Sequence, residues 1–494
     1  MILDYLRKRL LGMDNVHELT VTPFADQLIE KKSLGLISVH ALPINNGRSL
    51  KKSSLLSKYQ ELYGDEYLTS DVTYTGNVMD NPIKPEHVLK ESESITAKAF
   101  GAKKTFYTTM GTTLSNYIVV YGLSKECERV LVDKNCHQSI HFALQRNRNL
   151  ITYSENKKKF QDSGRLVMDV DNFLFKYEQA YKEGKPYKLV VLNGCSYEGV
   201  MYDIEKIIES CIQIHDDVHF FVDEAWSAHG YFHPFFKRYT AMNAANELRR
   251  KYPNRNISVT CTQSAHKSLS SLRQGSYIHV NSSEKVIQEI SMAKYMLHTT
   301  SPSYPILASL ELARAQMALE GYNLIEEQLQ ASKKLQNALQ ECNYLKINYD
   351  ELDYGWYRLD PTKISINFTM KELPIEYIKS ILLKLNIYIN RKTETSILFN
   401  LHIGIKDNEL SSIIQSLYEI ENLNVCWLNT QHQKQINYEP LPHQDNADYY
   451  LIAYPPGVPF VVPGDKIDNQ VCYDLQKLQL SGVSLIKSKI NKKA

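Results

Sequence analysis

Short runs of apolar residues alternate with amphipathic segments through the middle of this chain. Four short runs are mostly apolar and typical of strands in composition, at 130–133, 188–193, 219–225 and 257–263. The segments between them, and residues 84–101 before them, space their apolar residues along one helical face. Because the four runs are short, mostly apolar and separated by helical segments, they predict buried strands of one sheet. The pattern therefore predicts an α/β fold with a mostly parallel sheet covered by helices.

The later part of the chain repeats this alternation on a smaller scale. Residues 305–343 have the spacing of a long helix, with a break predicted at Gly321. Predicted strands and helices then alternate, at 364–370, 376–386, 396–404 and 408–421. Residues 454–465 contain four prolines and predict a rigid, extended loop.

Three parts of the chain follow from these patterns. Residues 1–85 begin with an amphipathic helix and continue into loop-like stretches, which predicts an arm that packs on something else. Residues 86–320 hold the regular alternation and form the predicted large domain. Residues 321–494, entered through the bridging helix, form the predicted small C-terminal α/β domain.

Composition and charge exclude several classes of protein. With 43% hydrophobic and 23% charged residues, the 494-residue chain is typical of a globular protein. A net charge of +2 offers no field to recruit nucleic acid or a membrane. The first 13 residues carry charges within their apolar stretch, so they make a poor signal peptide. The eight scattered cysteines favour reduced thiols, and together these features predict a cytoplasmic protein.

Three motifs at predicted strand or helix ends carry the candidate chemistry. Lys267 follows the strand 257–263, where a desolvated amine could condense with an aldehyde. Asp223 lies near the end of the run 219–225, where it could face a protonated pyridine nitrogen. Gly111, Thr112 and Thr113 open a helix that also carries Asn116, and backbone N–H groups with hydroxyls form an anion site there.

Each motif alone has an ordinary structural explanation: a lysine that reaches solvent, an acidic helix cap, or a threonine N-cap. Together, in this order, they match what pyridoxal phosphate (PLP) needs, namely an anion site, a pyridinium partner and a Schiff-base lysine. His137, directly after the strand 130–133, adds a flat imidazole that could stack on a planar ring.

With these motifs in place, the chain resembles the Orn/Lys/Arg decarboxylase family of PLP enzymes. The resemblance covers about 84–315 and 454–465, and its most specific stretches are VDKNCHQSIH, VDEAW, TQSAHKSLSSLRQGSYIH, HTTSPSYPILASLELAR and YPPGVPFVVPGD. It implies the fold type I (aspartate-aminotransferase) architecture, with a seven-stranded type of sheet. It also implies decarboxylation of lysine, ornithine or arginine to an amine and CO2.

The resemblance further implies a role for each matching residue. Lys267 would form the Schiff base, Asp223 would pair with the pyridinium nitrogen, and His137 would stack on the ring. Phosphate binding would fall to Thr112, Thr113, Ser264 and His266.

Other matching residues would complete the pocket. Trp226 would lie beside the ring, and Ser196 would line the pocket where the family usually has threonine. Thr299 and Thr300 match a segment that reaches the phosphate of a neighbouring subunit. The resemblance therefore implies a homodimer with shared active sites, or a ring of such dimers.

The chain also departs from the family pattern. Pro43 is followed by Ile44 and Asn45 where the family carries glycine and histidine, and Asp465 stands where glutamate is usual. These departures leave the substrate and the reaction outcome open. Asp465 and Glu198 are candidates to recognise the far end of a basic substrate, although both could equally be surface acids.

Two other functions stay open. One is transamination or oxidative deamination of a basic amino acid, for which Arg358 and Arg391 are the arginines available to bind a carboxylate. The other is a decarboxylase-like regulatory protein without turnover, which the changes after Pro43 favour and the retained Lys267 opposes.

Overall fold

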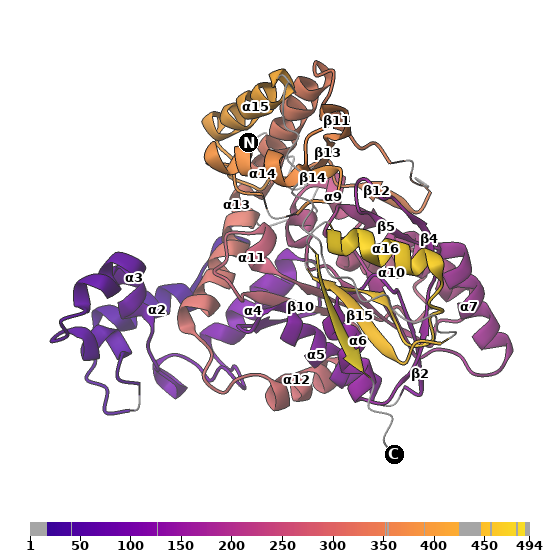
Figure 1. The fold of residues 1–494 in the computed structure, drawn as a ribbon. Helices are drawn as coiled ribbons and strands as arrows, with labels where there is room; N and C mark the ends of the chain where they lie inside the picture. The colour runs from indigo at the N-terminus through magenta and orange to yellow at the C-terminus, as the bar shows by residue number, and fades with distance from the viewer. Residues whose placement is uncertain are drawn as a thin grey trace.

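A seven-stranded sheet forms the centre of the molecule (Figure 1). The computed structural model describes residues 17–40, 42–125, 127–350, 352, 355–389, 391–423, 446–454, 457–480 and 483–489. The sheet order is β1-β10-β9-β8-β6-β2-β3. Its strands are, in that order, Lys104–Thr108, Ser276–Asn281, Val259–Gln263, His219–Asp223, Leu189–Asn193, Arg129–Val132 and Leu150–Tyr153. Strands β9, β8, β6, β2 and β3 run parallel and β10 is antiparallel to its neighbours, which confirms the predicted mostly parallel sheet.

Helices bury both faces of this sheet. Successive side chains of β2, β6 and β8 enter two different hydrophobic cores, because side chains alternate across a strand. One core packs against α5 (Gly111–Ser124), α6 (Gln138–Arg146) and α12 (Glu284–Leu297). The other packs against α7 (Val170–Lys182), α8 (Ile204–Ile214) and α10 (Ala241–Lys251). Burial on both faces explains why β2, β6 and β8 lack an alternating pattern in the sequence.

One long helix, α13 (Tyr304–Gln340), runs from the large sheet to a smaller one. The predicted break at Gly321 is wrong. A Cβ at this position would lie 2.9 Å from Met317 Cε and 3.0 Å from Phe232 Cβ, so the glycine allows close packing against the helix. The small domain is the sheet β11-β13-β14 with α14 and α15, and it follows the predicted alternation. Its elements are Lys346–Ile347, Lys363–Asn367, Ser396–Asn400, Ile375–Lys384 and Asp407–Asn422.

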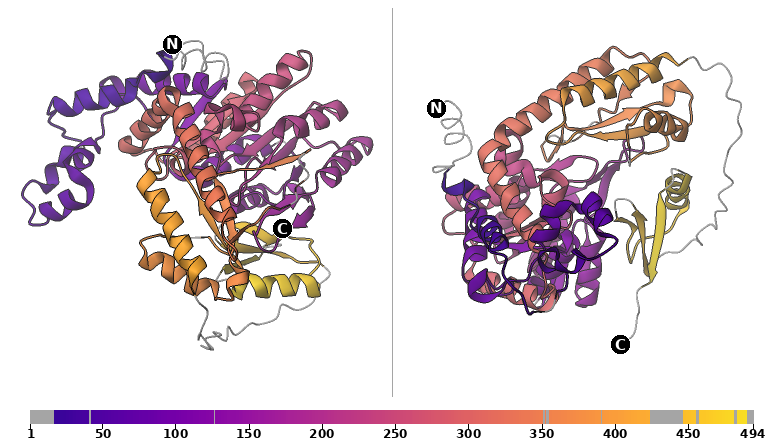
Figure 2. Two further views of the ribbon diagram at one scale, coloured as in Figure 1. Left: turned by 90° about the horizontal axis from the view of Figure 1, so that it is seen from above. Right: turned by 90° about the vertical axis from the view of Figure 1, so that its left-hand side faces the viewer.

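The C-terminal region forms a third small unit (Figure 2). Strands β16 (Val458–Val461), β15 (Tyr449–Tyr454) and β17 (Ser484–Lys489) form an antiparallel sheet that packs with α16 (Asn469–Leu480). The predicted extended loop at 454–465 is therefore wrong for β16, which pairs with β15. Pro459 is tolerated because β16 lies at the edge of the sheet.

The N-terminal helices α2 (Pro23–Ser33) and α3 (Leu56–Ser70) project from the body of the molecule (Figures 1 and 2). Their base is held by a buried pair on α13. Arg314 donates to the carbonyls of Leu19 and Val21, at 2.5 and 2.8 Å, and Glu311 accepts from two backbone N–H groups at the start of α2. The helix predicted within the first 13 residues lies outside the described part of the chain.

Shorter elements complete the description. They are α4 (Val88–Ala99), α9 (Pro234–Lys237), α11 (Ala265–Ser268), and the paired strands β4 (Asn156–Lys159) with β5 (Leu166–Met168) and β7 (Val200–Tyr202) with β12 (Tyr357–Leu359). No helix within the described ranges is long and apolar enough to cross a bilayer. The seven described cysteines are free thiols, as predicted, and Cys426 lies outside the described residues.

Candidate active site

The carboxyl ends of β2, β6, β8 and β9 and the start of α5 surround a cavity of about 260 Å³. This edge of the sheet is where open α/β folds bind ligands. Nine of the eleven residues predicted for the site line the cavity. They are Thr112, Thr113, His137, Ser196, Asp223, Trp226, Ser264, His266 and Lys267.

Lys267 lies on α11, the single helical turn that follows β9. Its Nζ lies 4.0 Å from the centre of the Trp226 ring. Burial lowers the pKa of Lys267 from 10.5 to about 8; the carboxylate of Asp223 opposes this shift and the ammonium of Lys363 adds to it. About a tenth of such amines are neutral near pH 7, against fewer than about one in a thousand for an ordinary lysine. The side chain is thus suited to nucleophilic chemistry.

Asp223, at the end of β8, is buried and held in one orientation. Its Oδ2 accepts from Asn116 Nδ2 at 3.0 Å, and its Oδ1 accepts from the backbone N–H of Ala225 at 3.0 Å. Asn116 is oriented in turn because its Oδ1 accepts from Thr262 Oγ1 at 2.7 Å. These contacts present a fixed carboxylate to the cavity.

Hydroxyl groups gather where α5 begins. Thr112 Oγ1 lies 2.5 Å from Ser264 Oγ and 2.9 Å from Ser276 Oγ. Thr113 lines the cavity from the same helical turn, whose backbone N–H groups favour an anion. His266 and Arg273 also line this part of the cavity, and Arg273 adds a positive charge. This end of the cavity has the donors that a phosphate group requires.

His137 caps the start of α6. Its Nδ1 accepts from the backbone N–H of Ser139 at 3.3 Å, which places the proton of the neutral ring on Nε2. Burial lowers the pKa of His137, so the ring is neutral near pH 7. The C-terminal unit packs against it: the Gly457 carbonyl accepts from the N–H of Gln138 at 2.8 Å, and a Cβ on Gly457 would lie 3.1 Å from His137 Nε2.

Trp226 and Ser196 form a wall of the cavity. The Trp226 ring packs edge-on against Tyr197, with ring centres 4.6 Å apart. Ser196 Oγ accepts from the backbone N–H of Val200 at 3.1 Å, so this hydroxyl holds the turn that precedes β7. Leu166 and Val458 add apolar surface to the cavity.

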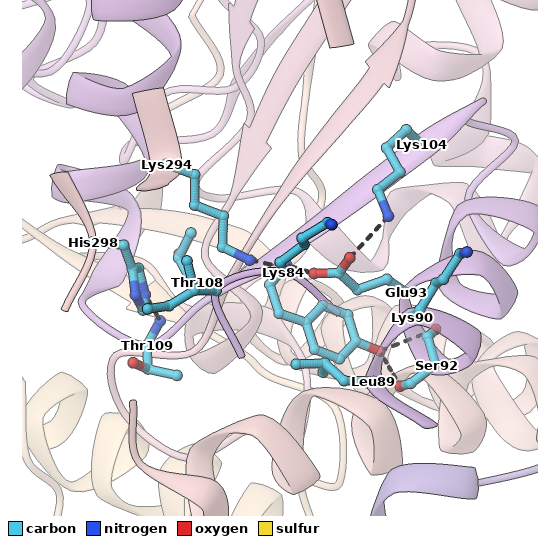
Figure 3. A network of polar contacts seen from close by, with 12 residues as sticks. Lys84, Leu89, Lys90, Ser92, Glu93, Lys104, Thr108, Thr109, Lys294 and His298 are labelled. Atoms are coloured by element: carbon cyan, nitrogen blue, oxygen red, sulfur yellow. Dashed lines mark hydrogen bonds and ion pairs between the residues drawn. The ribbon is translucent and has the colours of Figure 1, made fainter. Parts of the chain in front are cut away.

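Thr299 and Thr300 do not line the cavity of their own chain. They follow α12, whose end is held in place by the network in Figure 3. There, Lys294 and Lys104 both pair with the buried carboxylate of Glu93, and His298 Nε2 accepts from the N–H of Thr109 at 3.1 Å. Beyond this network, Thr299 is half-buried, whereas Thr300 and Ser301 are exposed.

The two acids considered for a basic substrate lie in different places. Glu198 lines the cavity, is buried, and accepts from Arg391 Nη2 at 2.7 Å through Oε1. Asp465 does not line the cavity and pairs with Lys134 instead. Of the two arginines, Arg391 is bound to Glu198 beside an adjoining chamber of about 150 Å³, and Arg358 lines a separate cleft.

Sequence reasoning missed several lining residues. Asn135, Asn193, Cys195, Tyr197 and Gln274 all line the cavity. Asn135 and Asn193 lie at the ends of β2 and β6, close to His137 and Ser196, so their position at the end of a predicted strand could have identified them. Arg273 lies within the stretch TQSAHKSLSSLRQGSYIH that resembles the family, but no role was predicted for it.

These residues fit PLP by their chemistry. An amine with a lowered pKa, a carboxylate fixed by Asn116, a flat neutral imidazole and a hydroxyl-lined helix start all face one cavity. The cavity and its sheet define the class: the chain has the fold of the fold type I PLP-dependent enzymes.

Comparison with known proteins narrows this class. The family model described as "Orn/Lys/Arg decarboxylase, major domain" matches residues 22–409, so the chain belongs to the Orn/Lys/Arg decarboxylase family. This membership implies PLP as the cofactor. An arginine decarboxylase of Bacillus anthracis is 25% identical over 477 residues, which cover 90% of each chain.

Solved structures agree on the fold. Lysine decarboxylase A from Pseudomonas aeruginosa superposes with a TM-score of 0.77 at 20% identity, covering 97% of this chain and 77% of its own. A lysine decarboxylase from Francisella novicida has a TM-score of 0.75 at 18% identity, covering 98% and 81% respectively.

Proposed function

We propose that this protein is a PLP-dependent decarboxylase that converts lysine, ornithine or arginine to the corresponding amine and CO2. The observation that carries the proposal is that Lys267 and Asp223 line the same cavity. The pKa of Lys267 is lowered to about 8 by burial, and Asp223 is fixed by Asn116. Family membership supports decarboxylation as the outcome.

In this proposal each residue has a binding role. The hydroxyls of Thr112, Thr113 and Ser264, with His266, would hold the phosphate at the start of α5. His137 would lie against the ring face. Asp223 would keep a proton on the ring nitrogen, because a fixed carboxylate favours the charged form of a nearby base.

PLP, when bound, supplies an electron-withdrawing ring that stabilises negative charge at the substrate Cα. Lys267 is the residue that would hold PLP through the aldehyde, and its side chain would lie beside the reacting atoms. Lys267 and His137 both line the cavity, and either would return a proton to Cα. The apolar surface of Trp226, Leu166 and Val458 would disfavour a carboxylate, and loss of CO2 removes that buried charge.

The substrate's distal cation would approach Glu198. This acid lines the cavity, and its Oε1 accepts from Arg391. The same contact disfavours aminotransferase activity. An aminotransferase needs an arginine to bind the substrate carboxylate, and Arg391 binds the carboxylate of Glu198 instead. Arg358 lines a different cleft.

We also propose a homodimer. Thr299 and Thr300 lie outside their own cavity, as residues that serve a neighbouring subunit would. The adjacent helix α12 exposes Met292, Tyr295 and Met296, which are 57%, 60% and 54% exposed. An apolar cluster of this kind is typical of an interface.

The test is direct. Purified protein with added PLP is incubated separately with lysine, ornithine and arginine, and CO2, amine and keto acid are measured. The proposal expects CO2 and the matching diamine or agmatine from one of the three, and neither product from Lys267→Ala. Keto acid without CO2 would establish transamination or oxidative deamination. No product with any of the three, despite bound PLP, would favour a regulatory protein.

A further inference from the structure

A second buried lysine reaches the wall of the proposed active site from the small domain. Lys363 is the first residue of β13, and its side chain is 3% exposed. Its Nζ donates to the Ser196 carbonyl at 3.1 Å, and lies 3.6 Å from Cys195 Sγ and 5.3 Å from the centre of the Trp226 ring. Both Lys363 and Lys267 therefore contact the same indole.

The position of Lys363 joins two parts of the molecule. Ser196, Cys195 and Trp226 belong to the large domain and line the cavity, whereas Lys363 belongs to the small domain. On its other side, Lys363 lines a cleft of about 700 Å³ between residues 234–239 and the small domain. Lys363 thus lies in the wall between this cleft and the cavity.

Charged and titratable groups of both domains lie near the ammonium of Lys363. They include Asp360, Cys195, His229 and Lys267. Burial raises the pKa of Cys195 to about 11 and lowers the pKa of His229 to about 4, so both are neutral near pH 7.

Asp360 is the one anion of this group, and its Oδ2 lies 3.9 Å from Lys363 Nζ. Its Oδ1 accepts from the backbone N–H and the hydroxyl of Thr362, at 3.0 and 2.6 Å. Asp360, the Ser196 carbonyl and the Trp226 ring together stabilise the buried ammonium. Because Ser196 and Trp226 also line the cavity, the charge of Lys363 is held at the wall of the site.

Lys371 is another buried lysine of the small domain, but unlike Lys363 it lies away from the cavity. Lys371 Nζ donates to the carbonyls of Glu421 and Leu423, at 2.7 and 2.8 Å, where α15 ends. These two bonds stabilise a helix end and involve no residue of the cavity. Lys371 therefore serves as a matched control.

We infer that Lys363 is a positioning residue of this site, which brings a positive charge from the small domain to the wall formed by Ser196 and Trp226, beside Lys267. The inference rests on the proposed function and deepens it. Its consequence is electrostatic: the charge of Lys363 disfavours a second ammonium nearby, and so favours the neutral, reactive form of Lys267. Movement of the small domain would then alter the reactivity of Lys267.

The experiment uses the full chain without cofactor, so it does not depend on decarboxylation. Lysines are labelled with a trace of acetic anhydride from about pH 6 to about pH 11, and the labelling of Lys267 is followed by peptide mass spectrometry. Only neutral amines react, so the midpoint of the profile reports the titration of Lys267. The variants are Lys363→Met, Lys363→Arg and Lys371→Met.

In Lys363→Met the midpoint for Lys267 should move to higher pH, and labelling near pH 7 should fall about threefold for a shift of half a unit. Lys363→Arg keeps the charge and should keep the midpoint, as should Lys371→Met. An unchanged midpoint in Lys363→Met, or an equal shift in either other variant, would overturn the inference. Lys363→Gln, which can still donate to Ser196, replaces Lys363→Met if that variant does not fold.

This result and the test of the proposed function are separable. A shifted midpoint together with no amine product would support the role of Lys363 and contradict the proposed decarboxylase activity. Amine production together with an unshifted midpoint would support the decarboxylase activity and contradict the role of Lys363.

Discussion

Replacing Lys267 with methionine should make the cofactor-free protein more stable near pH 7. Burial lowers the pKa of Lys267 from 10.5 to about 8, so the folded protein holds this ammonium at a free-energy penalty. At about 1.4 kcal/mol per pKa unit, the shift corresponds to about 3 kcal/mol. Methionine has a similar length and no charge, but it loses the contact between the ammonium and the Trp226 ring, which contributes about 1 kcal/mol. The expected net gain is about 2 kcal/mol.

The gain should depend on pH with a definite sign. Below about pH 8 the folded and unfolded states both carry the ammonium, and the folded state bears the full penalty. As the pH rises through 8, the folded protein releases this proton while the unfolded chain keeps it up to about 10.5. The penalty therefore shrinks between these two values. The stability advantage of Lys267→Met should be largest near pH 7 and mostly lost by about pH 9.5.

Urea unfolding of both proteins without PLP, at these two pH values, measures the effect. Lys371→Met is the control, because its loss leaves the carbonyls of Glu421 and Leu423 without their donor; it should lose about 2 kcal/mol at both pH values. The reasoning is refuted if the parent is at least as stable as Lys267→Met near pH 7, or if their difference does not change with pH.

Three further substitutions test other parts of the structure. Asn116→Leu removes the donor that fixes Asp223, so it should weaken PLP binding in a spectroscopic titration and lower stability by about 2 kcal/mol; unchanged affinity would contradict the role of this contact. Glu311→Gln leaves the buried Arg314 without its carboxylate and should cost about 3 kcal/mol, with faster hydrogen exchange in residues 19–33. Gly457→Ala places a Cβ 3.1 Å from His137 Nε2 at a φ of +93°, so it should reduce PLP affinity and destabilise the C-terminal unit, whereas a neutral result would show that this unit does not press on His137.

The class of fold and most of the candidate site could be predicted from local sequence. Short apolar runs identify the buried strands, and residues at the end of each run must lie at the carboxyl edge of the sheet. Asp223 lies near the end of such a run, and Lys267 and His137 each follow one. This is why the three lie together around one cavity although up to 130 positions separate them. The helix start at Thr112 follows the same logic.

The contacts made across domains could not be predicted from the sequence and depend on how the domains pack. Lys363 stands in an ordinary strand and Arg391 in a loop, and nothing local indicates that the first meets Ser196 or that the second meets Glu198. The pairing of β16 with β15, and the close packing at Gly321, likewise depend on which distant surface each segment meets. The physical reason is that periodicity determines the side of a strand or helix on which a residue lies, whereas its partner depends on how separate elements pack. The local sequence around a charged residue or a glycine that acts between domains therefore does not predict its partner.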